Sequence, residues 1–89
     1  SYGYPNPIRG QMGTLRVESN GAQNIKIMIY DLAGYFIRSF SSLPINSGIQ
    51  INEWTWDVSD IESGIYFAHV EVSDNESVER NIIKIAVIH

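Results

Sequence analysis

Three acidic residues lie close together in one short stretch of the chain and are the first candidates for chemistry. Asp57, Asp60 and Glu62 precede a glycine at position 64, in a segment whose composition is typical of a loop. Carboxylate oxygens on a loop are ligands that suit calcium. Their spacing matches no known calcium-binding loop, however, and solvated acidic residues are common in turns. The sequence therefore predicts no metal site, with calcium at these three residues as the alternative.

The chain has two histidines, His69 and His89, which are the next candidates as members of a catalytic triad. A Ser-His-Asp triad needs a serine presented on a strained turn, and the sequence contains no Gly-x-Ser-x-Gly motif. His69 falls within a predicted strand, where we interpret it as an ordinary surface residue. No catalytic residue, cofactor-binding residue or bound cofactor is predicted.

Several aromatic residues offer a third kind of site, a flat platform on which a sugar ring can stack. The residues concerned are Tyr30, Tyr35, Phe36, Trp54 and Trp56. Sandwich cores also bury tryptophan, which fills a large volume. Core packing is the favoured interpretation of Trp56 and, less strongly, of Trp54, whose exposure the sequence leaves open.

The elements that position these residues follow from hydrophobic periodicity. Apolar and polar residues alternate along most of the chain, which is typical of half-buried β-strands; Ile25, Ile27 and Ile29 share one face in the clearest case. Clusters of Gly, Asn, Asp and Ser separate such segments. The pattern favours an all-β fold, an antiparallel immunoglobulin-like β-sandwich of about seven strands. Strands are predicted at residues 14–19, 24–32, 35–40, 49–58, 64–72 and 78–88.

The composition excludes several classes of protein. The chain has 89 residues, so a single domain over residues 1–89 is expected, with residues 1–13 as its entry segment. The net charge of −4 argues against a nucleic-acid partner, because binding to phosphates needs a basic surface. The apolar runs are too short to span a bilayer, and no cysteine is present to form a disulfide. We expect the chain to be part of a longer polypeptide that carries the main activity elsewhere.

The fourth predicted strand breaks its own alternation. Ile49 and Ile51 have one parity, and Trp54 and Trp56 have the other. If all four side chains face the core, one extra residue must lie between the two pairs, so we predict a β-bulge near Asn52–Glu53. The alternative is that both tryptophans face solvent.

The last predicted strand is apolar on both faces. One face holds Ile83, Ile85 and Val87, and the other holds Ile82, Lys84, Ala86 and Ile88. A strand of this kind lies in the middle of a sheet or presents one apolar face to a partner. An open edge here would also allow two copies of the domain to pair as a homodimer.

Prolines and glycines predict the local backbone at three places. The Pro-Asn-Pro stretch at residues 5–7 removes two backbone donors, so it should lie along an edge without continuing a ladder. Asp31 and Gly34 bracket a tight hairpin in which Gly34 takes a positive φ. Gly64 is expected to take a positive φ as well, where a loop joins a strand.

Four segments, taken in order, resemble a known family. They are "YPNP" at 4–7, "IYDLAG" at 29–34, "WDVSDIESGIYFAHVEV" at 56–72 and "KIAVI" at 84–88. This set is similar to the C-terminal sorting domain (type A) of the type IX secretion system of Bacteroidetes. It also resembles the immunoglobulin-like domain of the flagellar hook-capping protein type. The short loop between Trp56-Asp57 and Gly64-Ile65-Tyr66 favours the sorting domain.

The resemblance implies a sorting signal and not an enzyme. An outer-membrane translocon would recognise the domain after its cargo, which precedes it in the parent protein, has folded, and a sortase-like protease would remove it. The cargo would pass from the periplasm to the cell surface or the medium. The resemblance assigns Trp56 and Tyr66 to the core and Pro5, Asn6 and Pro7 to the domain entry. It implies that translocon recognition involves Gly64, Tyr66, Ile82, Lys84, Ala86 and Ile88.

Recognition of this kind has a physical basis, because a label that is read after folding must carry its information on a surface. A terminal strand with an open edge can be read by addition of a partner strand. Two other functions stay open at this point. The domain could be a passive immunoglobulin-like spacer or a carbohydrate-binding module of a secreted multidomain enzyme.

Overall fold

The fold is built from strands. The computed structural model describes residues 2–4, 6–20, 23–42 and 48–89. Among those residues there is no helix with the length and apolar character needed to cross a membrane. The strands are β1 (Tyr2–Gly3), β2 (Ile8–Arg9), β3 (Met12–Asn20), β4 (Asn24–Asp31), β5 (Phe36–Ser42), β6 (Ile49–Asp57), β7 (Gly64–Ser73) and β8 (Val78–Ile88).

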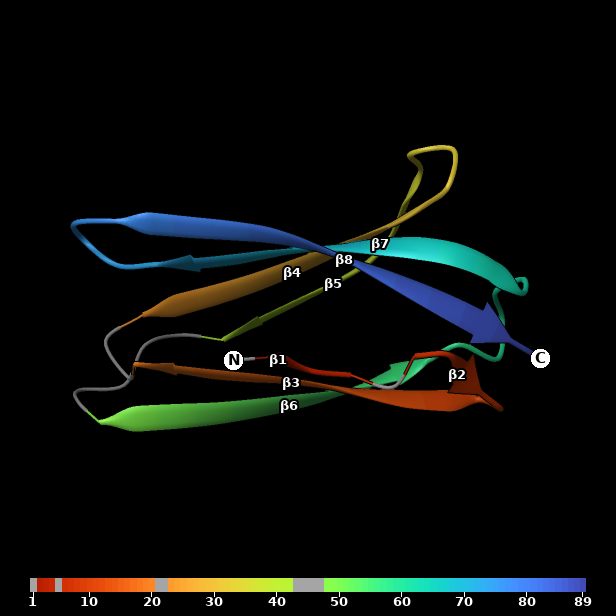
Figure 1. Ribbon diagram of the computed structural model, residues 1–89, viewed down its shortest axis with the longest axis horizontal. Helices are drawn as coiled ribbons and strands as arrows, with labels where there is room; N and C mark the ends of the chain where they lie inside the picture. Colours follow the sequence, from red (N-terminus) through yellow and green to blue (C-terminus); the bar gives the residue numbers. More distant parts are fainter. Residues whose placement is uncertain (1, 5, 21–22, 43–47) are drawn as a thin grey trace.

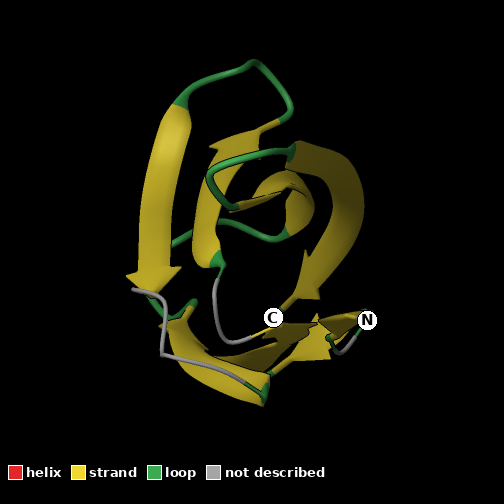
Figure 2. Ribbon diagram, turned by 90° about the vertical axis from the view of Figure 1, so that its left-hand side faces the viewer, coloured by secondary structure: helices red, strands yellow, loops and turns green. Residues whose placement is uncertain are grey.

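Two sheets pack face to face, as Figure 1 shows with the smaller sheet below the larger one. The smaller sheet has the order β1-β3-β6, and the larger has the order β2-β8-β7-β4-β5. Neighbouring strands are antiparallel except β2 and β8, which are parallel. Seen from one end in Figure 2, the strands of both layers curve around the interior. The all-β sandwich expected from the sequence is confirmed.

The entry segment contributes two short strands that the sequence did not predict. β1 pairs with β3 at one edge of the smaller sheet, and β2 pairs with β8 at one edge of the larger sheet. The chain therefore crosses from one layer to the other between Gly3 and Ile8. The peptide bond between Asn6 and Pro7, which lies in this crossing, is cis. Neither Asn6 nor Pro7 belongs to a ladder, as predicted, and Pro5 lies outside the described residues.

The core lies between the sheets and follows the alternation seen in the sequence. In β4, Ile25, Ile27 and Ile29 are all buried. The rings of Trp56 and Tyr66 meet edge to face across the interior, with centroids 5.8 Å apart. Both residues are buried, so both belong to the core as expected. The other buried hydrophobic residues are Ile8, Leu15, Val17, Phe40, Val58, Ala68, Val70, Val72, Ile85 and Val87.

The prediction of a β-bulge near Asn52–Glu53 is wrong. The pairing of β3 with β6 runs without a shift from Met12 opposite Asp57 to Asn20 opposite Ile49. Trp56 is buried and Trp54 packs against the core, so the tryptophans do not face solvent either. The isoleucines are the residues that face out, with Ile49 73% and Ile51 54% exposed.

Polar side chains take the inward positions that the isoleucines leave. The Gln50 side-chain amide donates to Asn52 Oδ1 at 3.0 Å and to Ser42 Oγ at 3.1 Å. Ser19, on the facing strand β3, is also buried. These hydrogen bonds between polar side chains make it possible for β6 to keep a regular register while its first half turns polar residues inward.

A bulge does occur in β5, which the sequence did not indicate. Ile29 lies opposite Arg38, but Tyr30 lies opposite Phe36, so Ile37 is the extra residue. The shift places Phe36 beside Tyr30, with ring centroids 6.0 Å apart, while Ile37 packs against the core. An extra residue of this kind redirects the side chains that follow it.

The hairpin between β4 and β5 has the predicted geometry. Asp31 Oδ1 accepts from the backbone N–H groups of Ala33 at 2.9 Å and Tyr35 at 2.8 Å, and Gly34 has a φ of 92°. The prediction for Gly64 is wrong, because positive φ occurs only at Gly10, Gly34 and Gly48 among the described residues. Gly64 is instead the first residue of β7, opposite Val87, and takes extended backbone.

We expect Gly13→Ala to lower the free energy of unfolding by about 1–3 kcal/mol, because added volume in a packed core forces strain. A Cβ at Gly13 would lie 2.6 Å from Cδ1 of Ile8, which is itself buried. Chemical denaturation of purified variants measures this effect.

The matched control for this prediction is Gly64→Ala, since no heavy atom lies within 4 Å of a Cβ added there. Its stability should be unchanged or higher by up to about 1 kcal/mol, because alanine lowers the entropy of the unfolded chain. Equal effects of the two substitutions would contradict the packing that we describe around Ile8.

Candidate functional site

The last strand, β8, buries one face and exposes the other. Ile85 and Val87 are each 1% exposed and belong to the core, and Ile83 packs partly against it. On the opposite face, Ile82 is 66% and Ile88 40% exposed. The outer face of this strand is therefore open to solvent.

Lys84 and Ala86 lie on the same outer face, so four of the residues assigned to recognition share one side of one strand. Lys84 is exposed and Ala86 is half-buried. They alternate with the buried residues because successive side chains of a strand point to opposite faces. The structure thus brings Ile82, Lys84, Ala86 and Ile88 into one row.

An aromatic band continues this row across the outer face of the five-stranded sheet. His69 lies between Met28 and Ile82 in the register of β4, β7 and β8. The rings of Tyr30 and His69 are in edge-to-face contact, with centroids 4.8 Å apart. A shallow hollow of about 260 Å³ lies here, with Lys26, Met28 and Ile82 among its lining residues. This outer face is able to bury apolar groups of a partner.

The charged side chains on this outer face are mostly positive, whereas the whole chain has a net charge of −4. Glu71 lies between Lys26 and Arg80 in the register, and Arg80 Nη2 is 3.3 Å from Glu71 Oε1. Lys84 adds a further positive charge two residues along β8. Because this ion pair is exposed, it contributes little to stability, and the band has positive charge to offer to a partner.

Asn6 holds the edge of β8 with its side chain. Its Nδ2 donates to the carbonyl oxygen of Lys84 at 3.3 Å, and its Oδ1 accepts from the backbone N–H of Ala86 at 3.0 Å. The amide therefore makes the two bonds that a neighbouring strand would make at this place. We call this pair of bonds the Asn6 clamp. Sequence reasoning placed Asn6 in the entry motif but did not predict its contact with β8.

Tyr66 is buried, in contrast to the four residues on the outer face of β8. Its side chain is 6% exposed, and its hydroxyl donates to the carbonyl oxygen of Glu62 at 2.6 Å. Burial raises the pKa of Tyr66, and the nearby carboxylates of Glu62 and Asp31 raise it further. Gly64 stands two residues away at the start of β7. The side chain of Tyr66 therefore contributes to packing, and any recognition through this motif would involve Gly64 and the backbone.

Asp57, one of the three acidic residues that suggested calcium, is used locally. Asp57 Oδ1 accepts from the backbone N–H of Ser59 at 2.9 Å and from its hydroxyl at 2.6 Å. These hydrogen bonds hold the pKa of Asp57 below its usual value. Within the described parts of the chain, no three acidic, histidine or cysteine side chains are grouped so that they could hold a metal ion.

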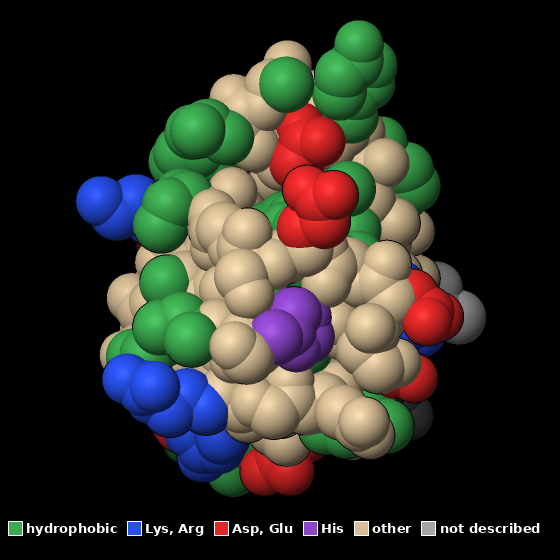
Figure 3. Space-filling model, turned by 90° about the vertical axis from the view of Figure 1, so that its right-hand side faces the viewer, with side chains coloured by type: hydrophobic (Ala, Val, Ile, Leu, Met, Phe, Trp, Pro, Cys, Tyr) green, Lys and Arg blue, Asp and Glu red, His purple; other side chains and the backbone are tan. Residues whose placement is uncertain are grey.

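The histidine at the end of the chain is engaged with the loop before β7. The backbone N–H of His89 donates to Ser63 Oγ at 2.8 Å, and its Nε2 lies 2.7 Å from the carbonyl oxygen of Ile61. Figure 3 shows this end of the molecule, with hydrophobic side chains exposed at its rim and a histidine near its middle. Because a carbonyl oxygen only accepts, Nε2 is the donor in this contact.

The aromatic residues do not form a flat platform. Trp54 is half-buried and its ring lies 6.3 Å from that of Phe40 toward the interior. Tyr30 meets its neighbours Phe36 and His69 edge to face, at interplanar angles of 71° and 66°. Stacking of a sugar ring needs coplanar faces, so this arrangement does not favour the carbohydrate-binding alternative.

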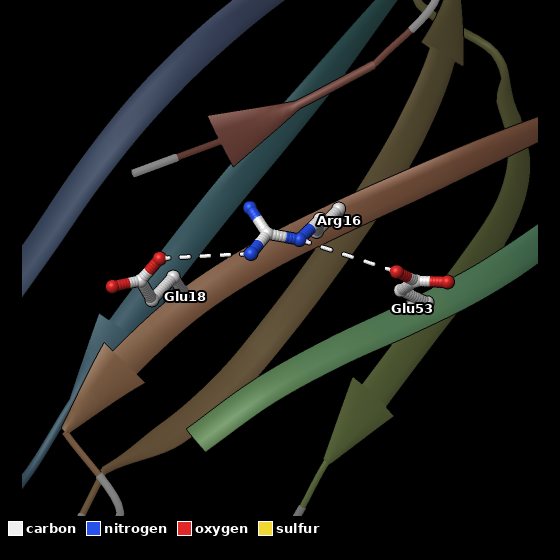
Figure 4. Close-up of polar contacts among 3 residues, drawn as sticks. All are labelled: Arg16, Glu18 and Glu53. Carbon is white, nitrogen blue, oxygen red and sulfur yellow. Dashed lines mark ion pairs between the residues drawn. The ribbon is translucent and has the colours of Figure 1, made fainter. Parts of the chain in front are cut away.

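The outer face of the smaller sheet differs in character. Figure 4 shows Arg16 between two carboxylates, at 3.7 Å from Glu18 and 4.0 Å from Glu53. Exposed ion pairs of this kind contribute about 0–1 kcal/mol each. Ile49 and Ile51 are exposed on this same face, which makes it a useful reference for substitutions on β8.

Comparison with known protein families shows where the chain belongs. The family model described as "Secretion system C-terminal sorting domain" matches residues 3–84. The chain belongs to this family. The resemblance of the sequence to the type IX secretion sorting domain is thereby confirmed. Membership indicates that the cargo of this sorting domain is secreted or displayed on the cell surface.

Solved structures resemble the sorting domain in fold. The C-terminal domain of wzt has a TM-score of 0.66 and 16% identity, over 96% of this chain and 65% of that one. Two structures of Parabacteroides merdae β-glucuronidase, one with glycerol in its active site, have a TM-score of 0.66 and 12% identity. The match covers 99% of the sorting domain and 13% of the enzyme. No curated protein matches. At these identities the structural similarity shows the fold alone.

We expect Tyr66→Phe to lower the free energy of unfolding by about 1 kcal/mol near neutral pH, because it leaves the Glu62 carbonyl without its buried donor. Since the folded-state pKa of Tyr66 is raised, its contribution is complete below about pH 10 and is lost as the pH rises through that pKa. The difference between wild type and variant should therefore shrink at alkaline pH.

Denaturant titrations at several pH values measure this difference. Tyr35→Phe serves as the control, because Tyr35 is 72% exposed and its replacement should change little. A gap between wild type and Tyr66→Phe that stays constant up to high pH would contradict the assignment.

Proposed function

We propose that the sorting domain is an address label which the type IX outer-membrane translocon reads in its folded state through the outer face of β8. The observation that carries the proposal is that β8 buries one of its faces in the core and exposes the other to solvent. Ile85 and Val87 complete the core, while Ile82 at 66% and Ile88 at 40% exposure leave apolar surface uncovered on the outer face. Large apolar side chains exposed in a row mark interaction surfaces.

The cargo precedes the domain in the parent protein and passes through the periplasm before export. A sortase-like protease then removes the domain by cutting on the N-terminal side of the entry motif. The Asn6 clamp supports this order of events, because residues from Asn6 onward are tied to β8 and are poorly placed to enter a protease as an extended chain.

The domain itself performs no catalysis in this proposal. Family membership supports this only indirectly, through the role of a sorting signal. The ring of His69 lies against Tyr30, and Nε2 of His89 lies against the carbonyl oxygen of Ile61.

We expect Ile82→Asp to reduce export of a reporter fused to this domain by at least about tenfold, since burying an apolar side chain is worth roughly 1.5–3 kcal/mol. The fusion is expressed in a type IX-competent bacterium, and reporter is measured in the medium, on the cell surface and in the periplasm. The expected change is accumulation of the variant in the periplasm.

Ile49→Asp is the matched control, because Ile49 is 73% exposed on the opposite sheet and receives the same substitution. Both purified variants should keep the thermal unfolding of the wild type. A point substitution is preferable to deletion of residues 80–89, which would remove Ile85 and Val87 from the core. Periplasmic retention of the wild-type fusion would favour a passive spacer, and equal export of the two variants would exclude recognition through Ile82.

A further inference from the structure

The Asn6 clamp fixes the direction of the backbone groups along β8. The carbonyl of Lys84 and the N–H of Ala86 both point away from β7, since both bond to Asn6. The register of β7 with β8 has no shift from Gly64 opposite Val87 to Ser73 opposite Val78. Along an antiparallel strand, the backbone N–H and C=O groups of successive residues point alternately to one side and the other. Those of Arg80 and Ile82 therefore also point away from β7.

These backbone groups meet no neighbouring strand within the described residues. On this side β8 pairs only with β2, where Ile8 lies opposite Val87 and Arg9 opposite Ile88. The Asn6 clamp occupies the next positions. Among the described residues, the edge of β8 is therefore closed from residue 84 to residue 88, whereas the outward backbone groups of Val78, Arg80 and Ile82 meet no other strand. We call the outward backbone groups of Val78, Arg80 and Ile82 the open half-edge.

An open edge is a template for an added strand, and Asn6 limits where that strand can lie. A partner strand can pair with Val78, Arg80 and Ile82, but it must end before Lys84 unless the clamp is released. The clamp thus sets the register of the added strand as well as its extent. This differs from addition along the whole of β8, because the residues nearest the chain end are already paired.

The side chains beside the open half-edge indicate the chemistry of the partner. The Arg80 side chain is 74% exposed, and Ile82 is 66% exposed. Residues directly opposite each other on neighbouring strands interact, so an acidic residue fits opposite Arg80 and an apolar residue fits opposite Ile82. Lys84 extends the positive charge beyond the end of the added strand.

A second copy of the domain fits this edge poorly. Antiparallel pairing of two β8 edges about Arg80 places Arg80 opposite its own copy, and pairing about Ile82 places Arg80 opposite Lys84 of the other copy. Pairing about Asn81 sets Arg80 opposite an isoleucine. Like charges opposite each other destabilise a pair of strands, and charged residues at an edge prevent pairing of identical edges.

From these observations we infer that the open half-edge docks an extended segment of the export machinery, with an acidic residue opposite Arg80 and an apolar residue opposite Ile82. This rests on the proposed function. It adds the side chain of Arg80 and the outward N–H of Arg80 to the groups that are read, and it makes Asn6 the residue that ends the docking site.

Three substitutions of Arg80 in the reporter fusion separate its charge from its backbone N–H. Arg80→Gln keeps the N–H and removes the charge, and it should reduce export several-fold. Arg80→Pro removes the outward N–H as well and should abolish export. Proline is tolerated where an edge N–H faces solvent, so the ladder between β7 and β8 should persist. Arg80→Glu opposes an acidic partner and should reduce export more than Arg80→Gln.

Thermal unfolding of the purified domains shows which variants fold. If Arg80→Pro has no unfolding transition, Arg80→Glu decides, because a charge reversal at an exposed side chain leaves the core intact. Wild-type export together with normal export of the folded variants overturns the docking edge and leaves the sorting function standing. Failure of the wild type to be exported overturns both.

Sedimentation of the wild-type domain tests whether a second copy of the domain occupies this edge instead. A dimer that Arg80→Pro dissociates without a change in export would assign the edge to a second copy and overturn the inference. A monomer with the graded loss of export across the three variants supports it.

Discussion

The period of two along β8 is the constraint on which the rest of the sandwich depends. Ile85 and Val87 must face inward to close the core between the larger sheet, to which β8 belongs, and the smaller sheet. A slip of one residue would move both into solvent and turn Lys84 and Ala86 inward. The same register fixes which side chains are displayed outward. Packing and display are therefore two results of one backbone geometry, and a substitution on the inner face would disturb both.

The Asn6 clamp adds a second dependence, between the two ends of the domain. Its two hydrogen bonds span sequence separations of 78 residues, to Lys84, and of 80 residues, to Ala86. β2, which follows the clamp, pairs in parallel with the last residues of β8. Contacts of such long range form only when most of the chain has been ordered, because closing a long loop costs entropy. The displayed face of β8 is therefore complete only in a domain that has finished folding, which suits a label that is read after folding.

Much of this fold can be predicted from the sequence, because alternation reports directly which residues share a face. The strands β4, β7 and β8 lie within one residue of their predicted bounds, and the hairpin at Asp31 and Gly34 has the predicted turn. Alternation does not report which face is the core. In β6 we assumed that Ile49 and Ile51 point inward, but the regular register turns Gln50 and Asn52 inward instead. The clamp could not be predicted, because its partners are adjacent only after the sandwich has closed.

The inward polar residues of β6 make the stability of the sandwich differ between its two ends. Ser19 Oγ, Gln50 Oε1 and Asn52 Nδ2 are buried and find no hydrogen-bond partner among the described residues. A buried polar atom without a partner costs about 1–3 kcal/mol, so these atoms lower the stability of this end of the sandwich. At the opposite end, Trp56 and Tyr66 pack edge to face in the core between the layers. We therefore expect local opening of the sandwich to begin at the end that holds Ser19, Gln50 and Asn52. The end where Trp56 packs, which also holds the last residues of β8, should stay closed longer.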